Sequence, residues 1–339
     1  MGLTSKGWRG WVGLVLPLAL LVAVLLASLI YSLHMPGQTH RGPLAPLSAE
    51  EGLIRDRLAA HVQTLAGNIG ERNLWHYPAL LRAASYIEGT LTELGYPPAD
   101  EPFESRGRTV RNILAEKRGS TQAAEIVLVG AHYDSVLVSP GANDNGSGVA
   151  ALLELARLLA DQALARTVRF VAFVNEEAPF FYSQEMGSLV HARGARSRGE
   201  HIQAMLALET IGYYSDTPGS QHYPFPLSLF YPDTANFIGF VGNLGSRGLV
   251  RRALYSFRRT TAFPAEGAAV PERLPGVGWS DHWSFWQAGY PAIMVTDTAF
   301  YRYAHYHTSG DTPEQLDYKR TARVVAGLAR VIAELAAGN

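Results

Sequence analysis

Two short apolar runs, at residues 126–131 and 168–174, constrain the fold of this chain more than any other feature. Both runs are rich in Val, Ile, Leu and Phe, which is typical of strands that are buried on both faces of a parallel sheet. The sequence around them reads GAHYDSV, then GANDNGSG, then VNEEAPFF. Polar residues that can bind a metal therefore follow each predicted strand directly.

The first run is followed by His132 and Asp134, and the second by Glu176 and Glu177. Residues two apart in an extended chain point to the same side, so His132 and Asp134 can act together. Adjacent residues point opposite ways, so the two glutamates are suited to different tasks.

The segment GANDNGSG lies between the two predicted strands and leads into a helical stripe of apolar residues over 149–159. This pattern places Asp144 in the loop just before a helix. A role as a helix cap is the alternative to a role in a metal site.

Two further apolar runs are also followed by polar residues that can bind a metal. Residues 205–208 end at Glu209, and residues 292–295 lead to the segment HYHTSGDT, which holds His305 and His307. In open α/β sheets, sites form in the crevice outside the carboxyl ends of the strands, so these side chains can converge although they span most of the chain. The sequence therefore predicts an α/β fold.

Composition limits the chemistry of such a site. The 339 residues include no cysteine, which excludes disulfides, thiolate metal sites and cysteine nucleophiles. The formal net charge of −1 gives no reason to expect nucleic acid as a partner. Any metal must be held by histidine and carboxylate, a ligand set that favours zinc, with manganese or cobalt as alternatives. A carboxylate can bridge two ions, and a second carboxylate beside a ligand can take a proton from water.

The uncharged stretch from Trp11 to Tyr31 predicts a membrane-spanning helix. At ~1.5 Å per residue it would reach about 31 Å, close to the thickness of the bilayer core. A cleaved signal peptide is the alternative, but the stretch is long for one and no clear cleavage site follows it. Lys6 and Arg9 precede the segment and the next basic residue is Arg41, so we expect the N-terminus in the cytoplasm and the rest outside, at the periplasmic face if the source is Gram-negative.

The remaining chain predicts three parts: residues 1–33 with the membrane segment, a Pro- and Gly-rich linker at 34–49, and one domain at 50–339. Ser48 and Glu51 form a capping-box pattern at the start of a helix. The further elements that the pattern predicts are helices at 48–65, 78–94, 247–259 and 321–336, strands at 109–117 (an edge strand) and 237–241, a short turn after Thr312-Pro313, and a long loop at 261–278.

The ordered motifs GAHYDSV, GANDNGSGVAALLELARLL, VNEEAPFF with MGS, LALETIGY, SDHWSFWQAGYPA and YHTSGDT resemble those of the M28 family of di-zinc metallopeptidases, which are mostly aminopeptidases. The resemblance covers about two thirds of the chain. It implies a mixed, mostly parallel central sheet flanked by helices, two zinc ions per chain and a peptide substrate.

By the same resemblance, each site residue has an implied role. His132 and Glu209 would hold one zinc, Glu177 and His307 would hold the other, and Asp144 would bridge them. Three further residues would assist: Glu176 as general base, Asp134 orienting His132, and Tyr306 polarising the scissile carbonyl.

The sequence departs from the family pattern at Glu209, where the family usually has Asp, and at residues 178–186, which add aromatic residues that could reshape the pocket. His305 is an alternative to His307, since two residues apart on a strand share one side. We expect Asp281 and His282 to support the site rather than to bind metal. Two other functions stay open: a glutaminyl-cyclase-like zinc acyltransferase, which needs one ion, and a non-catalytic ectodomain, which needs none.

Overall fold

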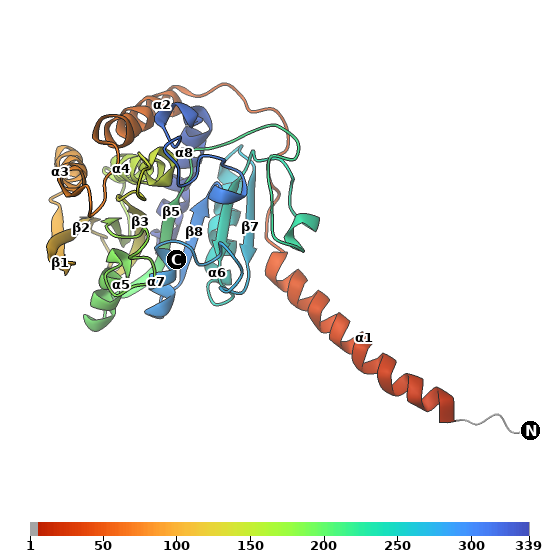
Figure 1. Ribbon diagram of the computed structural model, residues 1–339. Coiled ribbons are helices and arrows are strands. Elements are labelled where there is room, and N and C mark those ends of the chain that lie inside the picture. The colour runs from red at the N-terminus through yellow and green to blue at the C-terminus, as the bar shows by residue number, and fades with distance from the viewer. Residues whose placement is uncertain (1–5, 339) are drawn as a thin grey trace, which may run out of the picture.

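The computed structural model describes residues 6–338, except for the side chains of residues 6–14, 25 and 26. Eight strands form one mixed sheet in the order β1-β2-β4-β3-β5-β8-β6-β7 (Figure 1). The central strands β4, β3, β5 and β8 are parallel, as are β6 and β7, whereas β1–β2, β2–β4 and β6–β8 are antiparallel. The strands are β1 (Ala99–Ser105), β2 (Arg108–Lys117), β3 (Gln122–His132), β4 (Arg166–Phe173), β5 (His201–Glu209), β6 (Ile238–Gly242), β7 (Ala265–Ala269) and β8 (Ala292–Thr296).

Helices cover both faces of the sheet, which confirms the predicted fold class. Apolar residues of α2, α3, α4, α6 and α8 pack into one cluster on one face, and α5 and α7 contribute to a smaller cluster on the other. The domain helices are α2 (Ala49–Val62), α3 (Tyr77–Glu93), α4 (Gly148–Leu159), α5 (Gly187–Ser197), α6 (Arg247–Thr260), α7 (His282–Gln287) and α8 (Tyr318–Leu335).

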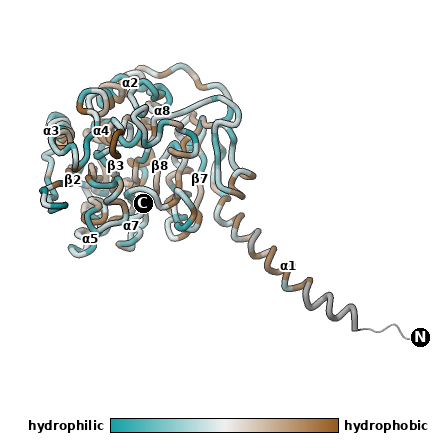
Figure 2. Tube along the Cα trace, viewed as in Figure 1, coloured by the Kyte–Doolittle hydropathy of each residue, from teal (hydrophilic) through white to brown (hydrophobic). Residues whose placement is uncertain are grey.

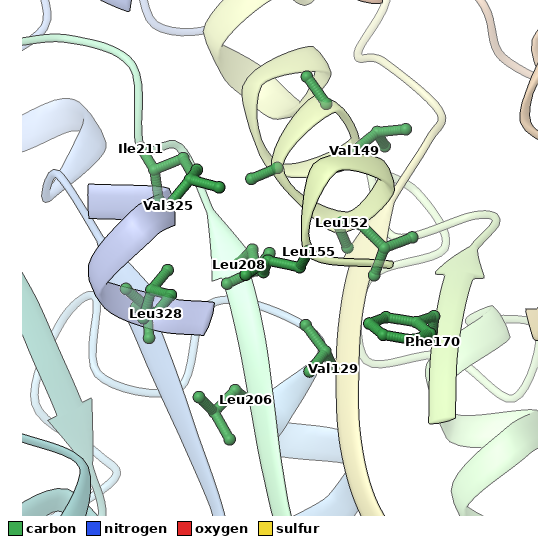
Figure 3. Packing of buried hydrophobic residues seen from close by; sticks show 14 of the residues in the cluster. Val129, Val149, Leu152, Leu155, Phe170, Leu206, Leu208, Ile211, Val325 and Leu328 are labelled. Atoms are coloured by element: carbon green, nitrogen blue, oxygen red, sulfur yellow. The ribbon is translucent and has the colours of Figure 1, made fainter. Parts of the chain in front are cut away.

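Strand β3 is buried on both faces, as its continuous apolar run predicts. Val127 and Val129 face the larger cluster, whereas Ile126 and Leu128 face the smaller one. Figure 3 shows Val129 and residues of β5 meeting the apolar stripe of α4. This packing fixes the end of β3, where the first site residue lies.

The capping box at the start of α2 is present. Ser48 Oγ accepts a hydrogen bond from the Glu51 N–H at 3.1 Å, and Glu51 Oε2 accepts one from the Ser48 N–H at 2.8 Å. The short turn after Thr312 is also present, as a 3₁₀ turn over Pro313–Gln315.

Three expectations about elements are wrong. Strand β2 is not an edge strand, because it pairs with both β1 and β4. The predicted loop at 261–278 contains β7, which pairs with β6. His305 and His307 do not lie on a strand, because the chain at residues 304–310 forms turns and a bend.

Helix α1 (Lys6–Leu33) precedes the domain and points away from it (Figure 1). Its part from Val15 to Leu33 is long and apolar enough to cross a membrane, and almost none of it is buried. Figure 2 shows apolar residues along these turns. A membrane span and a signal sequence both fit this observation. The side chains of Lys6 and Arg9, on which the predicted orientation depends, lie outside the described residues.

Residues 34–48 form no helix or strand, yet the domain binds the first of them. The guanidinium of Arg258 donates to the Pro36 carbonyl at 3.1 Å, and the Ala265 N–H donates to Thr39 Oγ1 at 2.9 Å. Met35 is buried in the core. The end of α1 is therefore attached to α6 and β7 rather than to a loose linker.

Candidate metal centre

The sheet brings the predicted site residues to one edge. His132 and Glu209 are the last residues of β3 and β5, and these strands are parallel neighbours, so both side chains emerge at the same edge. Glu176 and Glu177 follow the end of β4, which pairs in parallel with β3 on its other side. Asp144 lies in the irregular turn η2 (Ala142–Ser147) directly before α4.

Asp144 divides the cluster into two halves. In the inner half, His132 Nε2 lies 3.1 Å from Asp144 Oδ1 and 3.4 Å from Glu209 Oε2. In the outer half, His307 Nε2 lies 3.0 Å from Asp144 Oδ2 and 3.3 Å from Glu177 Oε2. The ligand atoms of each triad lie within 4.8 Å of one another. Each oxygen of the Asp144 carboxylate thus faces a separate histidine and a separate glutamate.

Asp134 holds the two glutamates in place. Its carboxylate accepts hydrogen bonds from the backbone N–H groups of Glu176 at 3.1 Å and Glu177 at 3.2 Å. His132 Nδ1 lies 3.1 Å from the Asp134 carbonyl oxygen and 3.6 Å from its carboxylate. A proton on Nδ1 that is shared with this carbonyl leaves the lone pair on Nε2 free for a metal.

Asp311 supports the turn that carries Asp144. Its carboxylate accepts hydrogen bonds from the N–H groups of Asn143 at 2.8 Å and Asp144 at 3.0 Å. The Asn145 side chain donates to the Leu208 carbonyl at 2.8 Å, which ties the turn to β5. The position of Asp144 relative to Glu209 is therefore set by hydrogen bonds from both sides.

A buried arginine, Arg72, completes this support and was not identified from the sequence. It is fully buried and donates to the carbonyls of Tyr133 at 2.7 Å and Gly141 at 2.8 Å, in the two loops that carry site residues. Burial lowers its pKa to about 10 against the opposing effect of nearby carboxylates such as Asp311, so it stays charged at neutral pH. Nothing in the local sequence around Arg72 signals these contacts.

Three residues in or next to the site have left-handed backbone conformations, which non-glycine residues rarely adopt. They are Asn175 (φ 60°), Thr210 (φ 46°) and His307 (φ 58°). The first two adjoin Glu176 and Glu209. Strain of this kind clusters where a structure positions functional groups.

The site gathers several buried carboxyl groups whose negative charge needs a nearby positive charge. Burial raises the pKa of Glu176, Glu177 and Glu209, because a charged carboxylate is poorly solvated there. For Asp144, burial acts in the same direction, but the neighbouring imidazoles of His132 and His307 lower its pKa overall. Burial opposes the charged form of His132, yet the carboxylates of Glu209 and Glu176 raise its pKa well above the usual range. The cluster thus favours a positive charge at its centre.

The residues fit a zinc site by two observations. Among the described residues, His132 Nε2 and Asp144 Oδ1 are buried without a hydrogen-bond partner. Buried polar groups are otherwise almost always paired, so both atoms need a partner. The separations of 3.0 to 3.4 Å between these ligand atoms also match the geometry of a tetrahedral ion, whose ligands at ~2.0–2.1 Å lie about 3.3 Å from each other.

The other candidates take different positions. Tyr306 stacks on the ring of His307, with centroids 3.8 Å apart, so its hydroxyl is carried beside the outer half. His305 instead packs against Tyr303 and is not in either triad. His282 Nε2 lies 2.7 Å from the Val277 carbonyl, and the buried Asp281 belongs to neither triad. Ser280, which we did not single out, donates to Glu209 Oε2 at 2.8 Å.

A cavity of about 110 Å³ opens beside the centre. Glu209 and Tyr306 line it together with apolar residues that include Phe237, Val270 and Met294. The cavity can therefore accept an apolar group next to the metal centre.

The aromatic segment at 178–186 does not line this cavity. Phe180 packs against Trp75, with ring centroids 5.7 Å apart, and Tyr182 against Trp283 at 4.3 Å. The Tyr182 hydroxyl donates to the Gly278 carbonyl at 3.0 Å. The segment therefore meets the cavity only through Gly278, which lies between the lining residues Val277 and Trp279.

Comparison with known proteins decides the family. The sequence model of Peptidase family M28 matches residues 112–332. The chain belongs to this family. The resemblance of its ordered motifs is thereby confirmed, and zinc is the metal that the family implies.

Among sequence relatives, the protein YfbL of Escherichia coli (strain K12), described as uncharacterized, is 39% identical over 80% of this chain and 86% of its own length. A probable aminopeptidase of Saccharomyces cerevisiae, YDR415C, is 27% identical over 69% of this chain, which spans only 60% of that protein. Among solved structures, a zinc aminopeptidase from Bacillus subtilis has a TM-score of 0.66 at 17% identity and covers 84% of this chain and 95% of its own. A glutaminyl cyclase from Porphyromonas gingivalis has a TM-score of 0.62 at 21% identity, over 83% and 98%. These two likenesses show a shared fold.

Proposed function

We propose that this chain is a membrane-anchored di-zinc aminopeptidase of the M28 family. The observation that carries the proposal is the position of Asp144, whose two carboxylate oxygens face two separate histidine and glutamate pairs. A cyclase with one ion needs only one such pair. A non-catalytic ectodomain has no need for this set of buried carboxylates, because burying charged carboxylates without a cation lowers the stability of the fold.

Within this proposal, His132, Asp144 and Glu209 hold one zinc, and Asp144, Glu177 and His307 hold the other. When bound, the two ions supply Lewis-acid polarisation of the substrate carbonyl and acidify the attacking water. Asp134 fixes the orientation of His132 and of both glutamates through the contacts described above.

Glu176 is the general base. Its Oε2 lies 3.8 Å from His132 Nε2, but its carboxylate belongs to neither ligand triad, so it is free to take a proton. It accepts a proton from the attacking water and passes it to the leaving amine of the peptide. Tyr306 donates a hydrogen bond from its hydroxyl to the scissile carbonyl, and the cavity beside it receives the side chain of the first substrate residue.

Helix α1 is proposed as an uncleaved anchor, with the N-terminus in the cytoplasm and the catalytic domain outside. In this arrangement residues 1–33 anchor the chain, residues 34–49 connect it, and residues 50–339 form the peptidase domain. When a reporter enzyme is fused after Asn339, we expect its activity to be found outside the cytoplasm. Activity of the reporter inside would contradict the orientation.

The test of function uses the full chain in detergent or nanodiscs, loaded with zinc. We expect hydrolysis of dipeptides and aminoacyl reporter substrates that have a free N-terminus, and no hydrolysis of the same substrates after N-acetylation. Glu176→Gln serves as the matched control for contaminating peptidases, because it should keep the metals and lose the activity. Cyclisation of N-terminal glutamine with one zinc per chain would instead favour the cyclase, and absence of both activities would favour the non-catalytic alternative.

A further inference from the structure

The segment from Tyr223 to Tyr231, which we call the apolar loop, exposes three large apolar side chains to solvent. The exposed fractions are 81% for Phe225, 68% for Leu229 and 51% for Phe230. Single exposed apolar residues are normal, but several large ones in one short segment mark a surface that meets a partner or a membrane. None of the residues that we assign to catalysis lies in this loop.

Tyr231 holds the apolar loop against the domain, because its hydroxyl donates to the Gly267 carbonyl of β7 at 2.7 Å. The Tyr223 hydroxyl donates to the carbonyl of Pro232, the residue directly after the loop, at 2.8 Å and so joins the two ends of the loop. The two tyrosine rings lie 5.7 Å apart, and both line the cavity beside the metal centre. One side of the loop is therefore fixed inward, and its exposed apolar side chains project from the other side.

The end of α1 lies beside this loop. Leu33, the last residue of α1, and Tyr231 pack against the same small cluster of Ala268, Val270 and Val277. Figure 1 shows the loop, in teal, beyond β7 on the side of the domain from which α1 leaves. The apolar loop therefore lies next to the end of α1.

Two arginines of α6 fix how the domain sits on α1. Arg247 Nε donates to the Tyr31 carbonyl at 2.6 Å, and its guanidinium lies 3.8 Å from the centre of the Tyr31 ring. Arg251 donates to the His34 carbonyl at 2.6 Å. These bonds attach α6 to the last turn of α1 and to the residue that follows it.

The charge around this junction suits a lipid surface. Arg247 and Arg251, both partly exposed, and the exposed Arg252 lie on the helix that holds the end of α1. Arginine beside aromatic and aliphatic side chains is the composition that settles at the boundary between lipid phosphates and acyl chains. A peptide or a second copy of the chain could bind on any side of the domain, whereas a membrane must lie on the side from which α1 departs. The position of the loop therefore favours a membrane.

We propose that the apolar loop inserts Phe225, Leu229 and Phe230 into the bilayer surface next to α1. The domain then rests on the membrane at two points, the end of α1 and the loop. Because the inner side of the same loop forms a wall of the cavity, the cavity lies close to the lipid surface. This inference rests on the proposed membrane anchoring of α1.

The absence of cysteine from the chain allows a direct test. Single variants Phe225→Cys and Leu229→Cys of the full-length protein are labelled with an environment-sensitive fluorophore, placed in nanodiscs, and measured with and without lipids that carry a spin-label quencher. Ile30→Cys, at an exposed position of α1, is the positive control, and Leu53→Cys, exposed on α2, is the matched negative control.

We expect the labels at 225 and 229 to lose at least half as much fluorescence as the label at 30, whereas the label at 53 is unchanged. If the label at 30 is quenched and those at 225 and 229 behave like the label at 53, the inference is overturned and the anchor stands. If the label at 30 is not quenched, the anchor fails and the inference fails with it. A blue shift at 225 without quenching would show that protein, not lipid, covers the loop, and would also overturn the inference.

Discussion

The two halves of the metal centre share Asp144 but are built differently. In the inner half, His132 is completely buried and, like Glu209, is the last residue of a central strand. In the outer half, His307 comes from a turn and its side chain is 36% exposed. Strand ends fix ligands through the whole sheet, whereas a turn fixes a ligand only locally. We therefore expect the inner half to hold its ion more tightly, and the outer half to be the one that opens to solvent and substrate.

The largest effect should come from Asp144→Ala, because this residue serves both halves. Zinc content should fall from two ions to less than one per chain, and peptidase activity should fall to the level of the chelated protein. The zinc content per chain is measured by mass spectrometry, and the turnover rate is measured in the presence of excess zinc. Retention of two ions would show that the halves do not depend on a shared carboxylate.

Glu176 and Glu177 should separate catalysis from metal binding. Glu176→Gln should keep both ions and lower turnover by ~10² to 10⁴-fold, because only the proton acceptor is lost. Glu177→Gln should weaken the ion of the outer half, because an amide is a poorer ligand than a carboxylate. Zinc per chain and turnover for both variants test this, and a metal lost from the first variant but not from the second would exchange the two roles.

Chelation should remove the two ions in two steps. A weak chelator reaches the outer half first, because His307 is the exposed ligand and His132 is not. We expect a stable species with one zinc per chain, and spectroscopy after replacement with cobalt should show that the first ion lost is the one affected by His307→Ala. Loss of both ions together, or loss from the inner half first, would contradict the difference between the halves.

The smallest effect should come from Ser280→Ala, which acts only on the inner half through its hydrogen bond to Glu209. Partners that orient a metal ligand are typically worth ~10 to 100-fold in metal affinity. We expect a reduction of this size for one ion and no change for the other, measured by competition with a zinc indicator. Ser256→Ala, which removes a buried serine hydroxyl bonded to Glu334 on α8 rather than to a metal ligand, is the control.

Much of the inner site could be predicted from the sequence because its ligands directly follow apolar strands. A buried strand leaves a strong local pattern, and its end is the place where a parallel sheet collects functional groups. His132 and Glu209 were found in this way, and the structure places both as the last residues of their strands. The placement of His307 needed the family motif, since the turn around it has no periodic signal.

The features that the sequence did not reveal leave no apolar pattern of their own. Strand β1 is polar, contains Pro102 and is mostly exposed, and β7 has the sequence AEGAA, so neither has the apolar pattern of a strand. Strand β1 instead forms hydrogen bonds with β2, which follows it directly in the chain, and β7 forms them with β6. Arg72 binds carbonyls that lie about 60 to 70 positions further along the chain, so only the folded structure reveals its role.

The central claim is that the carboxylate of Asp144 lies between two zinc ions. Anomalous diffraction at the zinc absorption edge, from crystals of the zinc-loaded protein, tests this claim directly. We predict two peaks ~3.5 to 4 Å apart, one beside His132 and Glu209 and the other beside His307 and Glu177. A single peak in zinc-saturated crystals, at either half alone, would contradict the account.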